Sequence, residues 1–182
     1  MTKAKSNVMA DFGAPILVLV LICAIMSGLL AFTNSVTDPI IKKAEEEAKK
    51  AARIEVLPGA DDFLQVEQAG LPDAVTEVYQ ATNDAGYTFS IVAQGYGGRN
   101  TLKMAVGIGM DGKLTGVKVL DHKETQGLGS KITTDEKFYG QFPGLDAAGA
   151  AGADTISGAT FSSNYYKDAI AAAFAAFELV RG

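Results

Sequence analysis

The chain has 182 residues, a formal net charge of −5, one cysteine and one histidine. This length suits one domain of ordinary size with an appendage. So few cysteines and histidines exclude disulfide frameworks, cysteine-held iron–sulfur clusters and Cys/His zinc sites, and we expect no metal ligand set. The acidic balance and the absence of a basic patch argue against a nucleic-acid partner. Any redox cofactor is therefore expected to be organic or to belong to another chain.

Residues 14–34 are predicted to form a transmembrane helix. No charged residue stands between Ala14 and Phe32, and this length matches the ~20 residues that a helix needs to cross about 30 Å of hydrocarbon. A cleaved signal peptide is the alternative, but the apolar region of a signal peptide normally runs for only about 7–15 residues. We therefore expect a permanent single-pass anchor in the lipid bilayer of the cell (inner) membrane.

Lysines on both sides of this segment bear on its orientation. Lys3 and Lys5 favour a cytoplasmic N-terminus, whereas Lys42 and Lys43 follow closely behind the other end. Because a long domain translocates largely regardless of its charge, we expect residues 1–13 in the cytoplasm and the C-terminal domain outside it.

Residues 35–58 are predicted to form a stalk helix. Thr37, Asp38 and Pro39 are typical of a helix start, and the stretch that follows is rich in Ala, Glu and Lys. The apolar stripe of this helix is modest, so the helix either packs on a partner or on the domain, or is a solvated stalk. A proline–glycine pair is expected to end it.

Residues 59–182 are predicted to form a small α+β domain. Four apolar runs with period-two alternation predict a mainly antiparallel sheet, and an Asp–Gly pair between the last two is typical of a hairpin. The stretch 127–153 is expected to be rich in loops, with a helical turn at Thr134–Tyr139. A C-terminal helix from about Ser163 places Phe174 and Phe177 on one face, which would cover the sheet. The four runs are Val75–Gln80, Tyr87–Gln94, Leu102–Met110 and Leu114–Leu120.

The segment 154–161, directly before this helix, carries several hydroxyl side chains, one glycine and one alanine. Exposed N–H groups and the positive end of the helix dipole favour a phosphate at such a helix start. Serine and threonine before an alanine-rich helix are also ordinary N-caps. From the spacing alone, capping is the simpler interpretation.

The sequence D-x-x-S-G-A-T at residues 154–160 resembles the flavinylation motif of the flavin-binding subunits of the Rnf and Na⁺-pumping NADH:quinone reductase complexes. Two further segments agree with it. H-K-E-T-Q-G-L-G at 122–129 is similar to the family's H-x-E-T-P-G-L-G loop, with Gln126 where proline is usual. G-Y-G-G at 95–98 is similar to the segment before the family's hairpin. Together with the N-terminal span, the resemblance covers nearly the whole chain.

This resemblance implies that a dedicated flavin transferase attaches FMN covalently, through its phosphate, to the hydroxyl of Thr160. It implies a subunit of an ion-translocating oxidoreductase, incomplete as an enzyme alone, that relays electrons between cofactors of neighbouring subunits. The family of Rnf G subunits is favoured. The alternatives are the homologous C subunit of the Na⁺-pumping NADH:quinone reductase, a membrane-tethered module that binds flavin without a covalent bond, and a pilin-like structural protein. Translocation of either Na⁺ or H⁺ fits the sequence.

The other predicted cofactor contacts lie in the same three segments. Glycines leave room for a flat ring, although each alone is also typical of a turn, and Glu124 and Thr125 can hydrogen-bond the polar edge of the ring. By the resemblance, the aspartate of the motif is recognised by the transferase or its metal; alternatively it caps a turn. Phe161, Tyr165 and Tyr166 either line the cofactor or pack in the core. The predicted contacts are Thr160, Ser157, Gly158, Ala159, Asp154, Glu124, Thr125, Gly127, Leu128, Gly129, Gly97 and Gly98.

Overall fold

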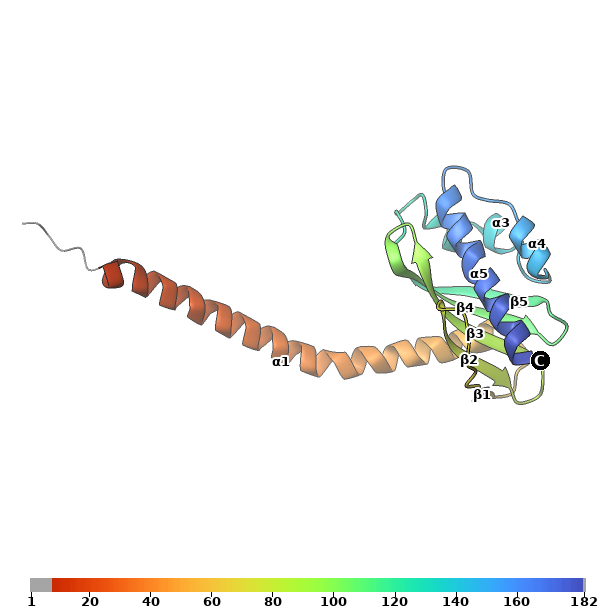
Figure 1. Ribbon diagram of the computed structural model, residues 1–182, viewed down its shortest axis with the longest axis horizontal. Helices are drawn as coiled ribbons and strands as arrows, with labels where there is room; N and C mark the ends of the chain where they lie inside the picture. Colours follow the sequence, from red (N-terminus) through yellow and green to blue (C-terminus); the bar gives the residue numbers. More distant parts are fainter. Residues whose placement is uncertain (1–7, 182) are drawn as a thin grey trace, which may run out of the picture. The chain divides into compact units, whose positions relative to one another are not determined.

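The computed structural model describes residues 8–181, and the chain divides into two compact units between Glu46 and Glu47. Helix α1 spans Val8–Val56. Its residues up to Glu46 belong to the first unit, and its last turns belong to the second. The second unit holds the sheet and the remaining helices (Figure 1). Of the predicted cytoplasmic segment, residues 1–7 lie outside the described residues.

The apolar segment of α1 is exposed along its length, and side chains such as Ile16, Leu21 and Leu30 keep more than half of their surface accessible. Within residues 8–181, this is the one helix long and apolar enough to cross a membrane, by length and composition. Contiguous apolar surface of this extent is unfavourable in water and suits hydrocarbon. The segment therefore could span a bilayer.

The prediction of a separate helix start at Thr37 is wrong, because α1 continues through this residue without a break. The Thr37 hydroxyl donates to the carbonyl of Thr33, one turn earlier, and so bonds within the helix instead of capping a new one. Pro39 is accommodated inside α1 at the loss of one backbone donor. The predicted anchor and stalk are thus parts of a single helix that ends at Val56.

The second unit is built on a five-stranded sheet in which each strand pairs antiparallel with the next along the chain. The α+β fold class is confirmed, as are the four predicted strands, and the Asp–Gly pair joins the last two. A short first strand was not predicted. The strands are β1 (Phe63–Gln65), β2 (Val75–Ala81), β3 (Gly86–Gly95), β4 (Gly98–Gly109) and β5 (Leu114–His122).

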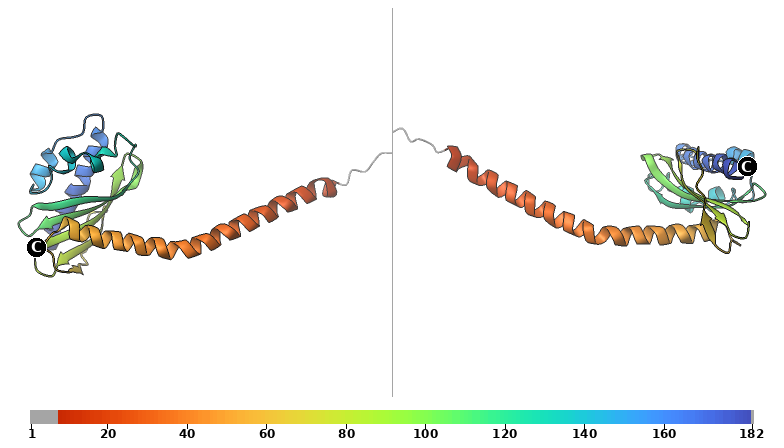
Figure 2. Two further views of the ribbon diagram at one scale, coloured as in Figure 1. Left: turned by 180° about the vertical axis from the view of Figure 1, so that it is seen from behind. Right: turned by 60° about the horizontal axis from the view of Figure 1, so that its bottom comes forward.

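Helix α5 (Thr160–Arg181) covers one face of this sheet, as Figures 1 and 2 show. Its apolar stripe, which includes Ile170 and Phe177, is buried in the core. The Phe177 ring meets the Tyr87 ring of β3 edge to face, with centroids 5.8 Å apart. Burial in the same core raises the pKa of the Tyr166 phenol. The predicted C-terminal helix is confirmed, and it begins three residues before Ser163.

The stretch 127–153 contains three short helices in addition to loops. Aspartates cap two of them, because the Asp135 carboxylate accepts the N–H of Lys137 and the Asp146 carboxylate accepts the N–H of Gly149. The second of the three lies within the helical turn predicted at Thr134–Tyr139, and the other two were not predicted. The helices are α2 (Lys131–Thr134), α3 (Glu136–Tyr139) and α4 (Ala147–Gly152).

The last turns of α1 pack on the opposite face of the sheet. Ala52 and Val56 are buried against Ala105 of β4. A Cβ atom at Gly107 would lie 2.1 Å from the carbonyl oxygen of Val56, so only glycine permits this approach. Thr115, at an irregularity in the pairing of β4 with β5, donates a hydrogen bond to the same carbonyl.

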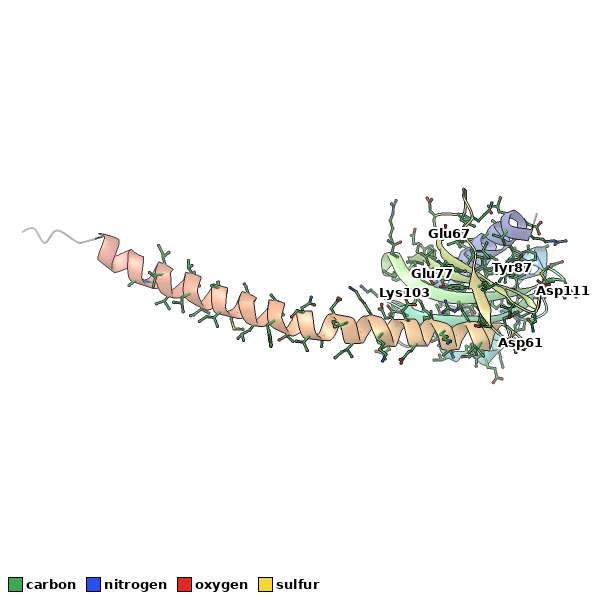
Figure 3. The ribbon with its side chains drawn as sticks, turned by 90° about the horizontal axis from the view of Figure 1, so that it is seen from below. Asp61, Glu67, Glu77, Tyr87, Lys103 and Asp111 are labelled. Carbon is green, nitrogen blue, oxygen red and sulfur yellow. The ribbon has the colours of Figure 1, made fainter. Side chains whose placement is uncertain are left out.

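Charged side chains border this contact. The Lys49 ammonium donates to the carboxylate of Glu77 on β2 at 2.8 Å, and the Arg53 guanidinium lies 3.9 Å from the centroid of the Tyr79 ring. Glu77 is one of the side chains labelled in Figure 3. The sequence left open whether the stalk packs on protein or is solvated. Its C-terminal turns pack on the domain.

We predict that Gly107→Ala destabilises the second unit by about 1–3 kcal/mol, because the added methyl group meets backbone that cannot move aside easily. Urea unfolding of the full-length chain in detergent measures this. Gly152→Ala, at the end of α4 where a Cβ atom meets nothing within 4 Å, is the matched control. Equal unfolding midpoints for the two variants would contradict the close packing of α1 on the sheet.

Candidate functional site

Three segments far apart in the sequence border one hollow of about 290 Å³, here called the α5 pocket. They are the turn between β3 and β4, the loop after β5, and the last residues before α5 together with its first turn. The pocket is close to the lower end of the volumes, about 300–1,000 Å³, that small ligands occupy. Its lining residues are Tyr96, Thr125, Leu128, Gly129, Gly158, Ala159, Phe161 and Ser162.

Thr160 is the first residue of α5, and it is exposed between two pairs of pocket-lining residues. The turn before it is held from within. The Ala159 N–H donates to the Ile156 carbonyl at 2.9 Å, and Gly158 takes a φ of +80°. The buried Ser163 hydroxyl accepts the Ile156 N–H and donates to the Ala159 carbonyl, both at 3.0 Å. The Thr160 hydroxyl thus stands on a fixed turn beside the pocket.

The electrostatics of this position favour an anion. The first turn of an α-helix has backbone N–H groups without intrahelical partners, and the dipole places partial positive charge there. Helix α5 is 22 residues long, so its dipole is fully developed at Thr160. A phosphate attached to or resting near this hydroxyl would be stabilised.

Glu124 lies inside the protein, with 8 % of its surface exposed. One carboxylate oxygen accepts the backbone N–H of Tyr96 at 2.8 Å, and the other accepts the hydroxyl of Ser162 at 2.5 Å. The predicted contact with the polar edge of a flavin would need an oxygen directed at the ligand. In this structure, both oxygens are instead bound within the protein and link two walls of the pocket.

The other predicted glycines serve the backbone around the pocket. A Cβ atom at Gly97 would lie 2.6 Å from the carbonyl oxygen of Lys123, so this glycine lets the β3–β4 turn approach the loop after β5. Gly98 belongs to the same turn, and the Gly127 N–H donates to the Ser130 hydroxyl within the loop. Unlike Gly129 and Gly158, these three residues do not line the α5 pocket.

Asp154 and Ser157 border a different hollow of about 360 Å³, which Lys131 and Lys137 also line. The Gln141 side chain bonds both the N–H and the carbonyl of Asp154 and so fixes the start of the motif. Within residues 8–181, no group of three or more His, Cys, Asp or Glu side chains could hold a metal ion.

Sequence reasoning missed Tyr96 and Ser162 as pocket residues and left Phe161 undecided. Phe161 lines the pocket, whereas Tyr166 is buried in the core. Tyr96 could have been found as the one large side chain in a turn of glycines. It is 62 % exposed, and with the exposed Phe161 and Leu128 it gives the pocket an apolar rim.

The family model described as an FMN-binding domain matches residues 95–175, and this match includes all three segments of the pocket. The geometry fits that cofactor. Apolar walls with small residues suit a flat ring, and the helix start at Thr160 suits its phosphate. The fold and the site together define a flavin-binding protein.

Several similar proteins are G subunits of ion-translocating oxidoreductase complexes. The G subunit of an ion-translocating oxidoreductase complex from Methanosarcina acetivorans is 35 % identical over 167 residues, which are 85 % of this chain and 88 % of the relative. The G subunit of a Na(+)-translocating ferredoxin:NAD(+) oxidoreductase complex from Acetobacterium woodii is 30 % identical over 172 residues, 81 % of this chain and 82 % of the relative. A third G subunit, from Stutzerimonas stutzeri, is 35 % identical over 139 residues, 70 % and 59 % of the two chains. The chain belongs to the family of G subunits of ion-translocating oxidoreductase complexes.

We predict that Ser163→Ala lowers the free energy of unfolding by about 1–3 kcal/mol, because it removes two buried hydrogen bonds that hold the turn before Thr160. Thermal or urea unfolding measures the change. Ser157→Ala, at an exposed hydroxyl six residues earlier, is the control and is expected to unfold like the wild type. A Ser163→Ala chain as stable as this control would show that the turn is held by other contacts.

Proposed function

We propose that the chain carries FMN as a phosphoester of Thr160 and relays electrons within a membrane complex that couples redox chemistry to Na⁺ or H⁺ translocation. The observation that carries this proposal is the exposed Thr160 hydroxyl at the first turn of α5, beside the pocket and within D-x-x-S-G-A-T. Family membership supports the redox role, because the relatives are oxidoreductase subunits.

Attachment joins the Thr160 Oγ1 atom to the phosphorus of the FMN phosphate. The flavin donor carries a leaving group on this phosphorus; the bond between the phosphorus and the leaving group breaks, and the hydroxyl proton is released. No electron is transferred in this step. Exposure of Thr160 leaves the hydroxyl accessible to a separate flavin transferase. The rigid turn held by Ser163 presents it in one orientation.

When bound, FMN supplies the redox chemistry, and the chain's own residues bind and orient it. Tyr96, Leu128 and Phe161 offer apolar surface for the ring, while Thr125 and Ser162 are the hydroxyl-bearing residues of the pocket. The small residues Gly158 and Ala159 join this pocket to Thr160. The ester thus fixes one end of the cofactor, and the pocket places the other.

The electron donor and acceptor belong to other subunits, since this chain has one cysteine, one histidine and no dinucleotide fingerprint. The apolar segment contributes no ion path of its own, because it has no Asp, Glu, Lys, Arg or His between Ala14 and Phe32. Coupling to Na⁺ or H⁺ therefore arises where this subunit meets its partners.

The domain is proposed to lie outside the cytoplasm, with the N-terminus inside. We predict that protease added to sealed vesicles that expose the outer membrane face removes the domain and leaves a fragment containing residues 14–34. Immunoblotting with an N-terminal tag follows this fragment, and a cytoplasmic protein trapped in the vesicles is the control. Protection of the domain until detergent is added would reverse the orientation.

We predict that Thr160→Ala abolishes covalent FMN while the fold is retained, because the exposed hydroxyl contributes nothing to the core. The chain is produced together with the transferase and run on a denaturing gel under ultraviolet light, and its circular dichroism is recorded. Ser157→Ala is the matched control and is expected to keep the fluorescent band.

Three other outcomes would contradict the proposal. A fluorescent band that persists in Thr160→Ala would place the ester elsewhere. Wild-type flavin that runs at the gel front would indicate binding without a covalent bond. A wild-type chain without flavin would remove the redox role.

A further inference from the structure

The buried carboxylate of Glu124 connects all three segments of the α5 pocket. Glu124 belongs to the loop after β5, its first bond reaches Tyr96 in the β3–β4 turn, and its second reaches Ser162 in the first turn of α5. Tyr96 and Ser162 both line the pocket, whereas Glu124 does not. A single side chain therefore ties together walls that are 28 and 38 residues away from it along the chain.

The space around this carboxylate is closed by glycines. A Cβ atom at Gly95 would lie 2.5 Å from one Glu124 oxygen, and a Cβ atom at Gly129 would lie 2.7 Å from the other. A side chain at either position would therefore require the Glu124 carboxylate to move. The backbone of the turn and of the loop thus reaches the carboxylate directly, and its two oxygens have fixed surroundings.

Burial of a carboxylate is costly unless its oxygens are bonded. An ionised carboxylate accepts hydrogen bonds only, and both partners here, an N–H and an O–H, are donors. Bonds to a charged acceptor are about twice as strong as bonds between neutral groups. The arrangement is therefore directional: it holds the donors at fixed places, which an apolar side chain of the same size would not do.

We propose that Glu124 is the positioning residue of the α5 pocket, and that its charge makes the bound flavin harder to reduce. The inference rests on the proposed function, since it assigns Glu124 a role toward the FMN of Thr160. Glu124 acts through Tyr96 and Ser162 and does not touch the cofactor. A negative charge one hydrogen bond behind the pocket wall disfavours the addition of electrons to a group in the pocket.

Two substitutions separate the bonds from the charge. Glu124→Gln keeps both bonds, because its carbonyl can accept the Tyr96 N–H and its amide can donate to the Ser162 hydroxyl, but it removes the charge. Glu124→Ala removes the two hydrogen bonds and the charge together. Glu67→Gln, at an exposed carboxylate between β1 and β2, is the matched control.

Positioning is measured twice on the full-length chain. In the flavin-free Thr160→Ala background, hydrogen exchange of the Tyr96 amide should become at least tenfold faster with Glu124→Ala and stay near the unsubstituted rate with Glu124→Gln. In the flavinylated chain, fluorescence anisotropy should fall with Glu124→Ala, because the ester retains the flavin while the ring loses its fixed place. Glu124→Gln should restore it.

The charge is measured as the reduction potential of the covalently bound flavin. Glu124→Gln should make this potential more positive by at least about 30 mV. For a two-electron couple, this is a tenfold change in the ratio of reduced to oxidised flavin. Glu67→Gln should leave it unchanged.

Unchanged Tyr96 exchange and unchanged anisotropy in Glu124→Ala would overturn the positioning role, and an unchanged potential in Glu124→Gln would overturn the role of the charge. If Glu124→Ala does not fold, Ser162→Ala replaces it; that substitution breaks one of the two bonds and should lower the anisotropy, and wild-type anisotropy would count against the proposal. A wild-type chain without flavin is a failure of the proposed function, and the exchange measurement still decides the positioning role.

Discussion

Burial of the apolar face of α5 against the sheet is the constraint on which the site depends. Ile170 and Phe177 fix the helix on β3 and its neighbours, and this packing determines where the first turn of α5 ends up. Thr160 at that turn is left exposed, while Ser162 and Ser163 point into the protein and are buried. A single helix thus supplies both core and site, and its first four residues divide between an accessible hydroxyl and two buried ones.

Close backbone approach is the second constraint, and glycine enables it at two places in the domain. At Gly107, the chain accepts the end of α1, and at Gly97 the β3–β4 turn accepts the loop after β5. The glycines at 95 and 129 approach a side chain instead of backbone and enclose the Glu124 carboxylate. Several glycines that look like room for a cofactor thus leave room for protein, and the pocket lies next to them.

The sequence predicted the elements of the domain well, because their signals are local. Period-two alternation found β2 to β5, and helical spacing found α5. The separate stalk helix was predicted wrongly, since Pro39 resembles a first helical position equally well when the helix has already begun. Of the short helices before α5, α3 lies within the helical turn predicted at Thr134–Tyr139, whereas α2 and α4 were missed, because four to six residues carry too little periodicity to be recognised.

The candidate site was predictable in part. Five of the residues that the motif resemblance predicted line one pocket, and Thr160 lies beside it; the five are Thr125, Leu128, Gly129, Gly158 and Ala159. The part played by Ser162 and Tyr96 depends on which side chains the fold turns inward, and local patterns do not contain that information. Burial of Glu124 is of the same kind: the sequence predicted a contact with the flavin ring, whereas in the structure both carboxylate oxygens are bonded within the protein.

The mass of the intact wild-type chain, followed by fragmentation of the peptide around the motif, tests the central claim most directly. Our account predicts that every chain made with the transferase is heavier by one FMN less one water, and that fragmentation assigns the added mass to Thr160. The unmodified mass, or the same addition on another residue, would contradict it.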